Sequence, residues 1–194
     1  MVEAPGRWSS RKKGIPVNNL AQQAAQLDAT GLLAVGRLIL EHEVVCLDER
    51  RWSDWLELFA QDCEYWAPAW KMDGLLTSDP QAELSHIYYP SRAGLEDRVI
   101  RIQSRSSPAS QPGRRTAHLI GNIQLLEEPS SRAMRLRSTW VTHVFTIQTH
   151  EAHAFFGYTE HSLIFQNDKW VFSHKKIILQ NDYIPSMLDV QCFC

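Results

Sequence analysis

Cysteine is scarce in this chain, and long hydrophobic runs are absent from it. The 194 residues include Cys46, Cys63, Cys192 and Cys194, and their small number and uneven placement exclude a disulfide scaffold. Only Cys192 and Cys194 lie close together, at an end that we expect to be frayed, so no zinc or iron–sulfur centre is encoded. No apolar run approaches the length of a transmembrane helix or a secretory signal, and we therefore expect a cytoplasmic protein.

Phosphate-binding and nucleophile motifs are missing as well. The chain contains no P-loop, no G-x-G-x-x-G and no G-x-S-x-G, which excludes the common phosphate cradles and the nucleophile elbow. Neither sign of charge is in large excess, because 20 Lys and Arg residues stand against 22 Asp and Glu residues, for a net charge of −2. This balance argues against nucleic acid or an anionic membrane surface as the partner.

The length favours a single folded domain. A chain of this size can bury a core without metal or disulfide support, and no repeat of solenoid period is visible. The first 19 residues place four Lys and Arg side chains among Gly, Pro, Ser and Asn, a composition that cannot bury enough surface to fold. We divide the chain into a flexible basic N-terminal arm, residues 1–30, and one α+β domain, residues 31–194. The arm is either a docking element or a solvated tail.

The stretch from residue 32 to residue 70 is the most strongly patterned part of the sequence. Apolar residues recur at helical spacing over 32–47, which predicts a long amphipathic helix with Glu43 among the residues that supply its charge. Tryptophan, leucine and phenylalanine at i, i+3, i+4 and i+7 predict a second helix over 52–59 that buries two indoles. A short aromatic strand over 63–67 follows.

The second half of the chain is predicted to be mainly β-structure. Alternating residues and turn signals indicate long strands at 115–126, 135–145, 155–166 and 170–180, preceded by a short strand at 85–90, a helix at 91–102 and an exposed loop at 103–114. Helices followed by hairpins predict an α+β fold in which the helices pack on one face of a curved antiparallel sheet.

Histidine is the residue type here most able to carry chemistry, and the chain has eight. His150, Glu151 and His153 lie close together and could begin a metal site, but they fall in a predicted turn, where a solvated loop is the stronger interpretation. Within strands, a hydrogen-bonded histidine of the core or the sheet face is commoner than a base or a ligand, and this applies to His118, His143, His161 and His174.

A curved sheet closed by helices can also enclose an acid–base pocket. In that case Asp62, Tyr65, His118 and His143 would be the polar groups at its mouth, with perturbed pKa values that permit proton transfer. This alternative is a stand-alone isomerase or dehydratase that uses Tyr65 and a strand histidine. A third possibility is a binding or scaffold module with an empty interior.

Arginines cluster on both sides of the predicted exposed loop. Guanidinium groups pair with carboxylates at protein interfaces, so Arg98, Arg101 and Arg115 are candidate contacts for a partner. Arg105 and Arg114 complete the set. A solvated basic loop would carry the same residues, and the sequence leaves both interpretations open.

Four blocks of residues together share the pattern of a known family. They are Leu47–Leu56 with Asp62–Pro68; Ile87–Tyr89 with Ser91-Arg92 and Gly94–Ile102; Arg115-Thr116, His118 and Asn122-Ile123; and Asn181-Asp182 to Ser186–Asp189. On these blocks the chain resembles the small (β) subunit of aromatic-ring-hydroxylating dioxygenases, most closely the benzoate, toluate and anthranilate branch. The blocks run through roughly residues 35 to 190, and Gly94–Ile102 is the most specific of them.

The resemblance implies a cone-shaped, cystatin-like or nuclear-transport-factor-like α+β fold. It also implies a partner, a large (α) subunit that carries a Rieske [2Fe–2S] cluster and a mononuclear Fe(II), in a trimer-based hetero-hexamer. Electrons would come from NADH through a reductase, with or without a ferredoxin, and dioxygen would be inserted into an aromatic carboxylate or a similarly polar monocyclic arene. The family places no catalytic residue, metal or cofactor on the small subunit, so a structural role is implied for this chain.

Two segments depart from the pattern of this branch. The arm of residues 1–30 is longer and more basic than is usual, and Val190–Cys194 replaces the usual aromatic tail. Both differences bear on how the chain would dock to a partner.

Overall fold

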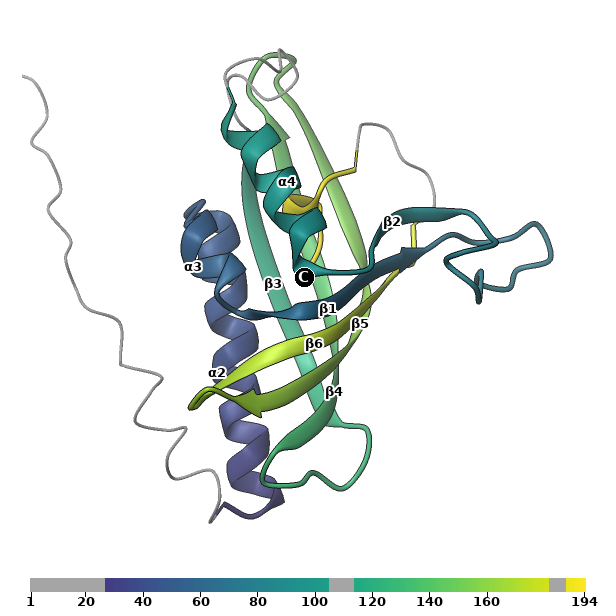
Figure 1. The fold of residues 1–194 in the computed structure, drawn as a ribbon. Coiled ribbons are helices and arrows are strands. Elements are labelled where there is room, and N and C mark those ends of the chain that lie inside the picture. Colours follow the sequence, from purple (N-terminus) through teal and green to yellow (C-terminus); the bar gives the residue numbers. More distant parts are fainter. Residues whose placement is uncertain (1–26, 105–113, 182–187) are drawn as a thin grey trace, which may run out of the picture.

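The computed structural model describes residues 27–104, 114–181 and 188–194. In these segments a curved sheet wraps around one long helix, and two shorter helices lie near one end of that helix (Figure 1). The elements are α2 (Ala29–Asp48), α3 (Trp52–Leu56), β1 (Phe59–Pro68), β2 (Ser85–Tyr89), α4 (Arg92–Gln103), β3 (Arg115–Leu125), β4 (Ala133–Thr146), β5 (Glu151–Gln166), β6 (Lys169–Leu179) and the 3-10 turn η3 (Val190–Cys192). The predicted α+β arrangement, with helices on a curved sheet, is confirmed.

The six strands form one sheet in the order β2-β1-β6-β5-β4-β3. Strands β3 to β6 make the predicted antiparallel meander, and β1 and β2 are antiparallel neighbours. One pairing is not antiparallel, because β1 runs parallel to β6. Whether β6 runs parallel or antiparallel to β1 depends on the whole path of the chain between the two strands. Local residue patterns do not reveal that path. Register shifts in β1, β3 and β5 mark irregularities of the kind that bend and twist a sheet.

Helix α2 is the central element of the cone. Its N-cap residue Asp28 accepts a hydrogen bond from the Gly31 amide at 2.8 Å, so the helix starts just before the boundary that we predicted at residue 30. Gly36 allows α2 to approach the sheet closely, because a β-carbon at this position would lie 2.4 Å from Cδ1 of Leu136. The N-terminal arm up to residue 26 lies outside the described residues.

The second helix is shorter than its spacing predicts. Helix α3 ends at Leu56, and Phe59, which the pattern places on this helix, is the first residue of β1. There the Phe59 ring lies 5.2 Å from the ring of Phe172 on β6, and the Leu58 carbonyl accepts a hydrogen bond from the Phe172 amide at 2.8 Å. Pairing with β6 therefore overrides the helical pattern. Both indoles of α3 are buried, as predicted, and Trp55 is fully enclosed.

The C-terminal residues belong to the core. We expect a frayed end from the sequence, but Val190, Phe193 and Cys194 are at most 2 % exposed. The Phe193 ring packs edge-on against Trp140 of β4 at 5.9 Å, and the Thr159 hydroxyl of β5 donates a hydrogen bond to the Cys194 carbonyl. Burial of these apolar side chains is more favourable than their exposure to water in a frayed end, because the curved sheet leaves an interior space that they fill.

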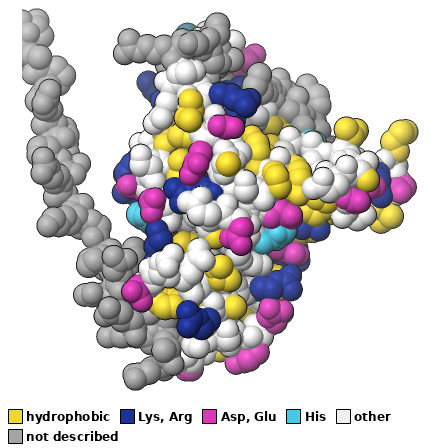
Figure 2. Space-filling view, in the orientation of Figure 1, with side chains coloured by type: hydrophobic (Ala, Val, Ile, Leu, Met, Phe, Trp, Pro, Cys, Tyr) yellow, Lys and Arg dark blue, Asp and Glu magenta, His cyan; other side chains and the backbone are white. Residues whose placement is uncertain are grey.

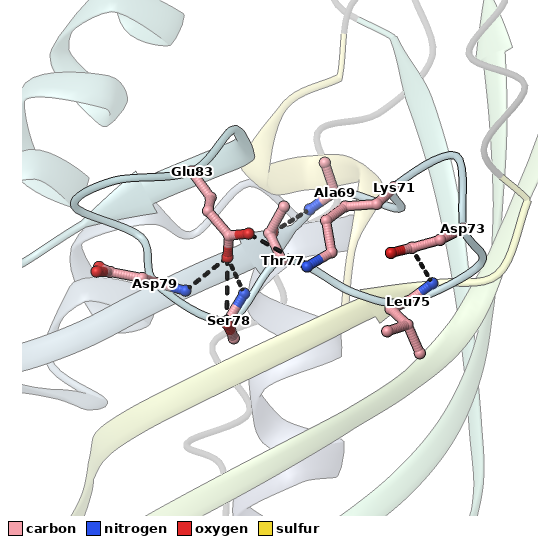
Figure 3. A network of polar contacts seen from close by, with 8 residues as sticks. All are labelled: Ala69, Lys71, Asp73, Leu75, Thr77, Ser78, Asp79 and Glu83. Atoms are coloured by element: carbon pink, nitrogen blue, oxygen red, sulfur yellow. Dashed lines mark hydrogen bonds and ion pairs between the residues drawn. The ribbon is translucent and has the colours of Figure 1, made fainter.

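A loop of residues 69–84, which we call the projecting loop, extends from β1 and β2 away from the body of the molecule (Figure 1). Its internal polar contacts are drawn in Figure 3. The Glu83 carboxylate accepts hydrogen bonds from the amides of Ser78 and Asp79 and pairs with Lys71 at 3.2 Å. The loop is therefore shaped by its own side chains.

The surface carries charges of both signs. Basic and acidic side chains are interspersed over the face seen in Figure 2, and no large area of one sign is visible there. Within the described segments, no helix is both long and apolar enough to cross a bilayer.

Candidate functional site

A buried ion pair occupies the interior of the cone. Lys175 of β6 and Glu43 of α2 each have side chains only 1 % exposed, and the ammonium group contacts the carboxylate directly. Trp55 Nε1 donates to the same carboxylate at 3.3 Å. The rings of Tyr65 and Phe172 lie 5.9 and 5.4 Å from the ammonium nitrogen. Because buried charges are tolerated only when they are paired and hydrogen-bonded, this contact fixes α2 against β6.

Sequence reasoning missed this pair. The helical pattern puts Glu43 among the charged residues of α2, yet it lies three residues after Leu40 and four before Leu47, on the buried face. Lys175 occupies an inward position of β6, two residues before the buried Ile177. The sequence signal for the pair was one acidic residue within the apolar stripe of a helix and one lysine at an inward strand position.

His161 of β5 is buried in the same interior. Its Nε2 lies 3.0 Å from Ser138 Oγ, and its ring lies 5.7 Å from that of Phe172. Burial, reinforced by the charge of Lys175, lowers the pKa of His161 well below its ordinary value, so the ring is neutral. The prediction of a hydrogen-bonded core histidine at this position is confirmed.

Asp48 and His118 join the end of α2 to the start of β3. The Asp48 carboxylate lies 2.6 Å from His118 Nδ1 and accepts a hydrogen bond from the Thr116 hydroxyl at 2.8 Å. Burial alone would raise the pKa of Asp48, but the hydrogen bonds from His118 and Thr116 outweigh it and lower the pKa. His118 is therefore held as a link between two elements, as its strand position predicts.

The acid–base set suggested by the sequence does not come together. Asp62 and His143 are exposed, whereas Tyr65 and His118 are buried. The alternation of β3 and β4 places His143 on the solvent side of the sheet and His118 on the core side. Tyr65 lies among aromatic rings, and burial, followed by the charge of Glu43, raises its pKa well above the ordinary value. A shared pocket for these four groups is therefore wrong.

The three candidate interface arginines have different surroundings. Arg98 of α4 forms a bidentate ion pair with Asp189, with its Nε 2.8 Å from Oδ1 and its terminal nitrogen 2.7 Å from Oδ2. These hydrogen bonds raise the pKa of Arg98 and attach the segment before η3 to α4. Arg101 and Arg115 are exposed on α4 and at the start of β3. Arg105 lies outside the described residues.

The described residues do not fit a metal centre. Three or more His, Cys, Asp or Glu side chains suited to one ion do not gather anywhere in residues 27–104, 114–181 and 188–194. His150 lies in the turn before β5 and stacks on Phe145, while Glu151 and His153 are in β5 and form a loose ion pair at 3.9 Å. All four cysteine thiols are free and buried, and burial raises their pKa, for Cys63 and Cys194 to about 12.

Comparison with known proteins identifies the family of this cone. The family described as "Ring hydroxylating beta subunit" matches residues 42–186, which is well over half of the chain. This chain belongs to that family. The similarity extends to named relatives: the chain is 40 % identical over 154 residues to the toluate 1,2-dioxygenase subunit beta of Pseudomonas putida, with 79 % of this chain and 93 % of the relative covered.

Two further comparisons agree with the assignment to the ring-hydroxylating beta subunits. The benzoate 1,2-dioxygenase subunit beta of Acinetobacter baylyi is 36 % identical over 166 residues, covering 86 % of this chain and 96 % of the relative. The crystal structure of the benzoate 1,2-dioxygenase beta subunit from Burkholderia mallei superposes with a TM-score of 0.67 at 30 % identity, covering 82 % of this chain and 96 % of that one. The resemblance stated from the four sequence blocks is confirmed, and membership in a family of beta subunits implies a partner subunit.

Proposed function

We propose that this chain is the non-catalytic small subunit of the terminal oxygenase of a cytoplasmic Rieske non-haem iron dioxygenase that hydroxylates aromatic rings. The large subunit would hold the [2Fe–2S] cluster and the mononuclear Fe(II), and would receive electrons from NADH through a reductase, with or without a ferredoxin. The observation that carries this proposal is the family match over residues 42–186. A trimer-based hetero-hexamer is the assembly that we propose.

The proposed substrate class is an aromatic carboxylate or a similarly polar monocyclic arene. The relatives that support it are named for toluate and benzoate, which are both carboxylated single rings. Identities of 36–40 % support the class of substrate and not a particular compound.

A structural role for this chain is supported by how its interior is used. Two pairs of titratable groups hold elements together: Glu43 pairs with Lys175 in the interior across α2 and β6, and the partly exposed Asp48 binds the buried His118 across α2 and β3. Phe193 and Cys194 fill the space beside β4 and β5. The geometry therefore gives no support to the isomerase or dehydratase alternative.

Arg98, Arg101 and Arg115 are proposed as contributors to the partner interface. Arg101 and Arg115 are exposed and could pair with carboxylates of a partner, whereas Arg98 would act by holding Asp189 and the segment next to it. This gives the three residues two distinguishable roles.

The decisive experiment is to tag this chain in its own cell and purify it under native conditions. We expect a stoichiometric larger subunit, bound iron and the visible absorbance of a Rieske cluster, with oxidation of benzoate or a substituted benzoate by the complex. The full-length chain purified alone should show neither iron nor turnover. A colourless single species from the native source, or turnover of a substrate by the chain alone, would contradict the proposal.

A further inference from the structure

The inner side of the sheet carries many polar side chains for a surface that is buried. Six of them, each at most 8 % exposed, form three cross-strand pairs: His118 of β3 with Thr142 of β4, Ser138 of β4 with Thr159 of β5, and His161 of β5 with Lys175 of β6. Burial of polar groups is costly, so an interior that serves packing alone is mainly apolar. Polar groups that converge within an apolar enclosure are typical of a small-molecule site.

Residues 188–194, which we call the closing segment, cover part of this polar lining. The Thr159 hydroxyl donates a hydrogen bond to the Cys194 carbonyl, and the Thr142 hydroxyl lies 3.8 Å from the Cys194 thiol. The ring of Phe193 fills the neighbouring space. The chain thus places an aromatic ring and a carbonyl group of its own against the lining.

The closing segment leaves part of the lining without a hydrogen bond. Among the residues that the structure describes, three buried side-chain atoms on the inner strands have no partner: His118 Nε2, His161 Nδ1 and Trp140 Nε1. Phe193 packs edge-on against the Trp140 ring at 5.9 Å but offers no polar side-chain atom to it. Because buried polar atoms are nearly always hydrogen-bonded, these three indicate a lining with capacity for another occupant.

The charges of the interior favour an uncharged occupant. The buried ammonium group of Lys175 already has its counter-ion in Glu43, and His118 binds the carboxylate of Asp48. A further anion beside these groups would lose its hydration without gaining a cation of its own. An uncharged polar group avoids this cost and can still accept or donate hydrogen bonds.

The closing segment is attached to α4 by an ion pair that reaches the surface. Arg98 binds both carboxylate oxygens of Asp189, at 2.8 and 2.7 Å, and the Arg98 side chain is 22 % exposed. Asp189 Oδ1 also accepts a hydrogen bond from the Val190 amide at 2.7 Å, where η3 begins. In Figure 1 the turn η3 lies beside α4. Opening of this one ion pair would release the segment from the helix.

We propose that the closing segment is a lid over an internal binding site for a small uncharged arene that carries a carbonyl or amide group. The ring of the ligand takes the place of the Phe193 ring. Its polar group takes the place of the Cys194 carbonyl as the partner of Thr159. The ligand enters when the ion pair to α4 opens. The inference goes beyond the proposed function and does not depend on it, since it concerns this chain alone.

Alkylation of the full chain by iodoacetamide measures the opening of the lid. Cys192 and Cys194 belong to the closing segment, whereas Cys46 in α2 and Cys63 in β1 are buried controls within the same chain. Asp189→Asn weakens the ion pair to α4 and should speed alkylation of Cys192 and Cys194 by about tenfold, the effect typical of a lost charge-assisted hydrogen bond. The rates at the two controls should not change.

Benzamide is the probe for the ligand, and benzoate and toluene are its matched controls. Benzoate has nearly the shape of benzamide but carries a charge, and toluene has the ring without the polar group. In the unaltered chain, benzamide should raise the alkylation rate of Cys194 to a saturating value, because the bound ligand holds the lid open. Benzoate and toluene should have little effect. A rate that benzamide leaves unchanged or lowers would overturn the proposal.

A chain that ends at Cys192 lacks both groups that occupy the site and should bind benzamide without competition. Calorimetry should show weaker binding of benzoate and toluene. Thr159→Val in this shortened chain removes the hydroxyl, keeps the side-chain size and should weaken benzamide binding roughly two- to tenfold. Equal affinity for benzamide and toluene would reveal an ordinary apolar cavity and contradict the assignment. Circular dichroism checks the fold, and the alkylation of the unaltered chain needs no variant.

The outcomes also separate this inference from the proposed function. Equal alkylation rates at all four thiols would mean that the domain opens as a whole, which would overturn the lid and leave the proposed function intact. Saturable opening by benzamide in a chain that does not co-purify with an iron-containing subunit would support the lid and contradict the proposed function.

Discussion

Lys175 is the residue whose replacement should most clearly show what the cone interior does. Lys175→Met keeps most of the side-chain volume but leaves the Glu43 carboxylate buried without its partner, which typically costs about 3–5 kcal/mol of unfolding free energy. We expect a loss of this size in urea unfolding of the full chain. The double variant Glu43→Leu with Lys175→Met removes both charges and should recover most of the loss. An equal loss in the single and double variants would mean that the pair does not act as a unit.

Glu83 allows a pH prediction at the surface. Hydrogen bonds from the amides of Ser78 and Asp79, then from Lys71, lower its pKa to about 2 from the ordinary value of 4.5. A lowered pKa in the folded state means that the contribution to stability is fully present above pH 4.5 and is lost as the pH falls through about 2. The amides of Ser78 and Asp79 should therefore stay protected from hydrogen exchange at pH 4 and lose protection near pH 2.

The control for this titration is Glu83→Gln, which removes the carboxylate and keeps the shape of the side chain. The variant should show weak protection of Ser78 and Asp79 at every pH. Protection that is unchanged in the variant would show that the backbone, and not the carboxylate, holds the loop.

Contacts of individual residues were the least predictable feature of the structure. Strand alternation correctly predicted that His118 and His161 would be hydrogen-bonded within the protein. It could not reveal that Lys175 meets Glu43, because these residues are 132 positions apart and are joined only by the fold. Asp62 and His143 are also separated from Tyr65, because they lie on the side of the sheet that is not covered. The residue pattern of a strand indicates only weakly which side will be covered.

At the level of elements, the pairing of β5 with β6 depends on Gly157. A β-carbon there would lie 1.9 Å from the Ile178 carbonyl oxygen, which is part of the backbone of β6 and cannot move without disturbing the sheet. Gly157→Ala should therefore lower the free energy of unfolding by about 1–3 kcal/mol or more. The matched control is Gly121→Ala in β3, where a β-carbon meets nothing within 4 Å and the change should stay within about 0.5 kcal/mol. Equal losses of stability in the two variants, measured by thermal unfolding, would contradict a clash of the added β-carbon as the cause.

Most elements were predictable because they depend on local patterns. The apolar stripe of α2 and the alternation of the four long strands fixed these elements from sequence, as the structure confirms. The end of α3 was wrong because Phe59 satisfies both a helical spacing and a strand, and only its contact with Phe172 decides between them. The buried segment after Asp189 was missed for a related reason, since its place inside the cone is provided by strands distant in sequence.

At the scale of the whole molecule, the parallel contact of β1 with β6 joins the two halves of the chain. Residues 59–68 and 169–179 are far apart in sequence, and their pairing completes the curved sheet around α2 (Figure 1). The curvature gives the sheet an inner side, where buried side chains pack against α2, and an outer side that faces solvent.

The last prediction concerns assembly and separates two arginines of the proposed interface. Arg98→Glu places a carboxylate against Asp189, which is only 8 % exposed at its side chain, so it should destabilise the chain itself. Losing charged hydrogen bonds of this kind costs about 1.5–3 kcal/mol, and the melting temperature of the isolated chain should fall. Arg115 is exposed, so Arg115→Glu should leave the melting temperature unchanged and still reduce the yield of the assembled complex.

In both variants the complex that does form should have normal iron content and absorbance, because neither residue belongs to an iron site. Normal yield of the complex in both variants would remove the arginines from the interface, and restored melting in Arg98→Glu with Asp189→Arg would confirm the internal role of Arg98.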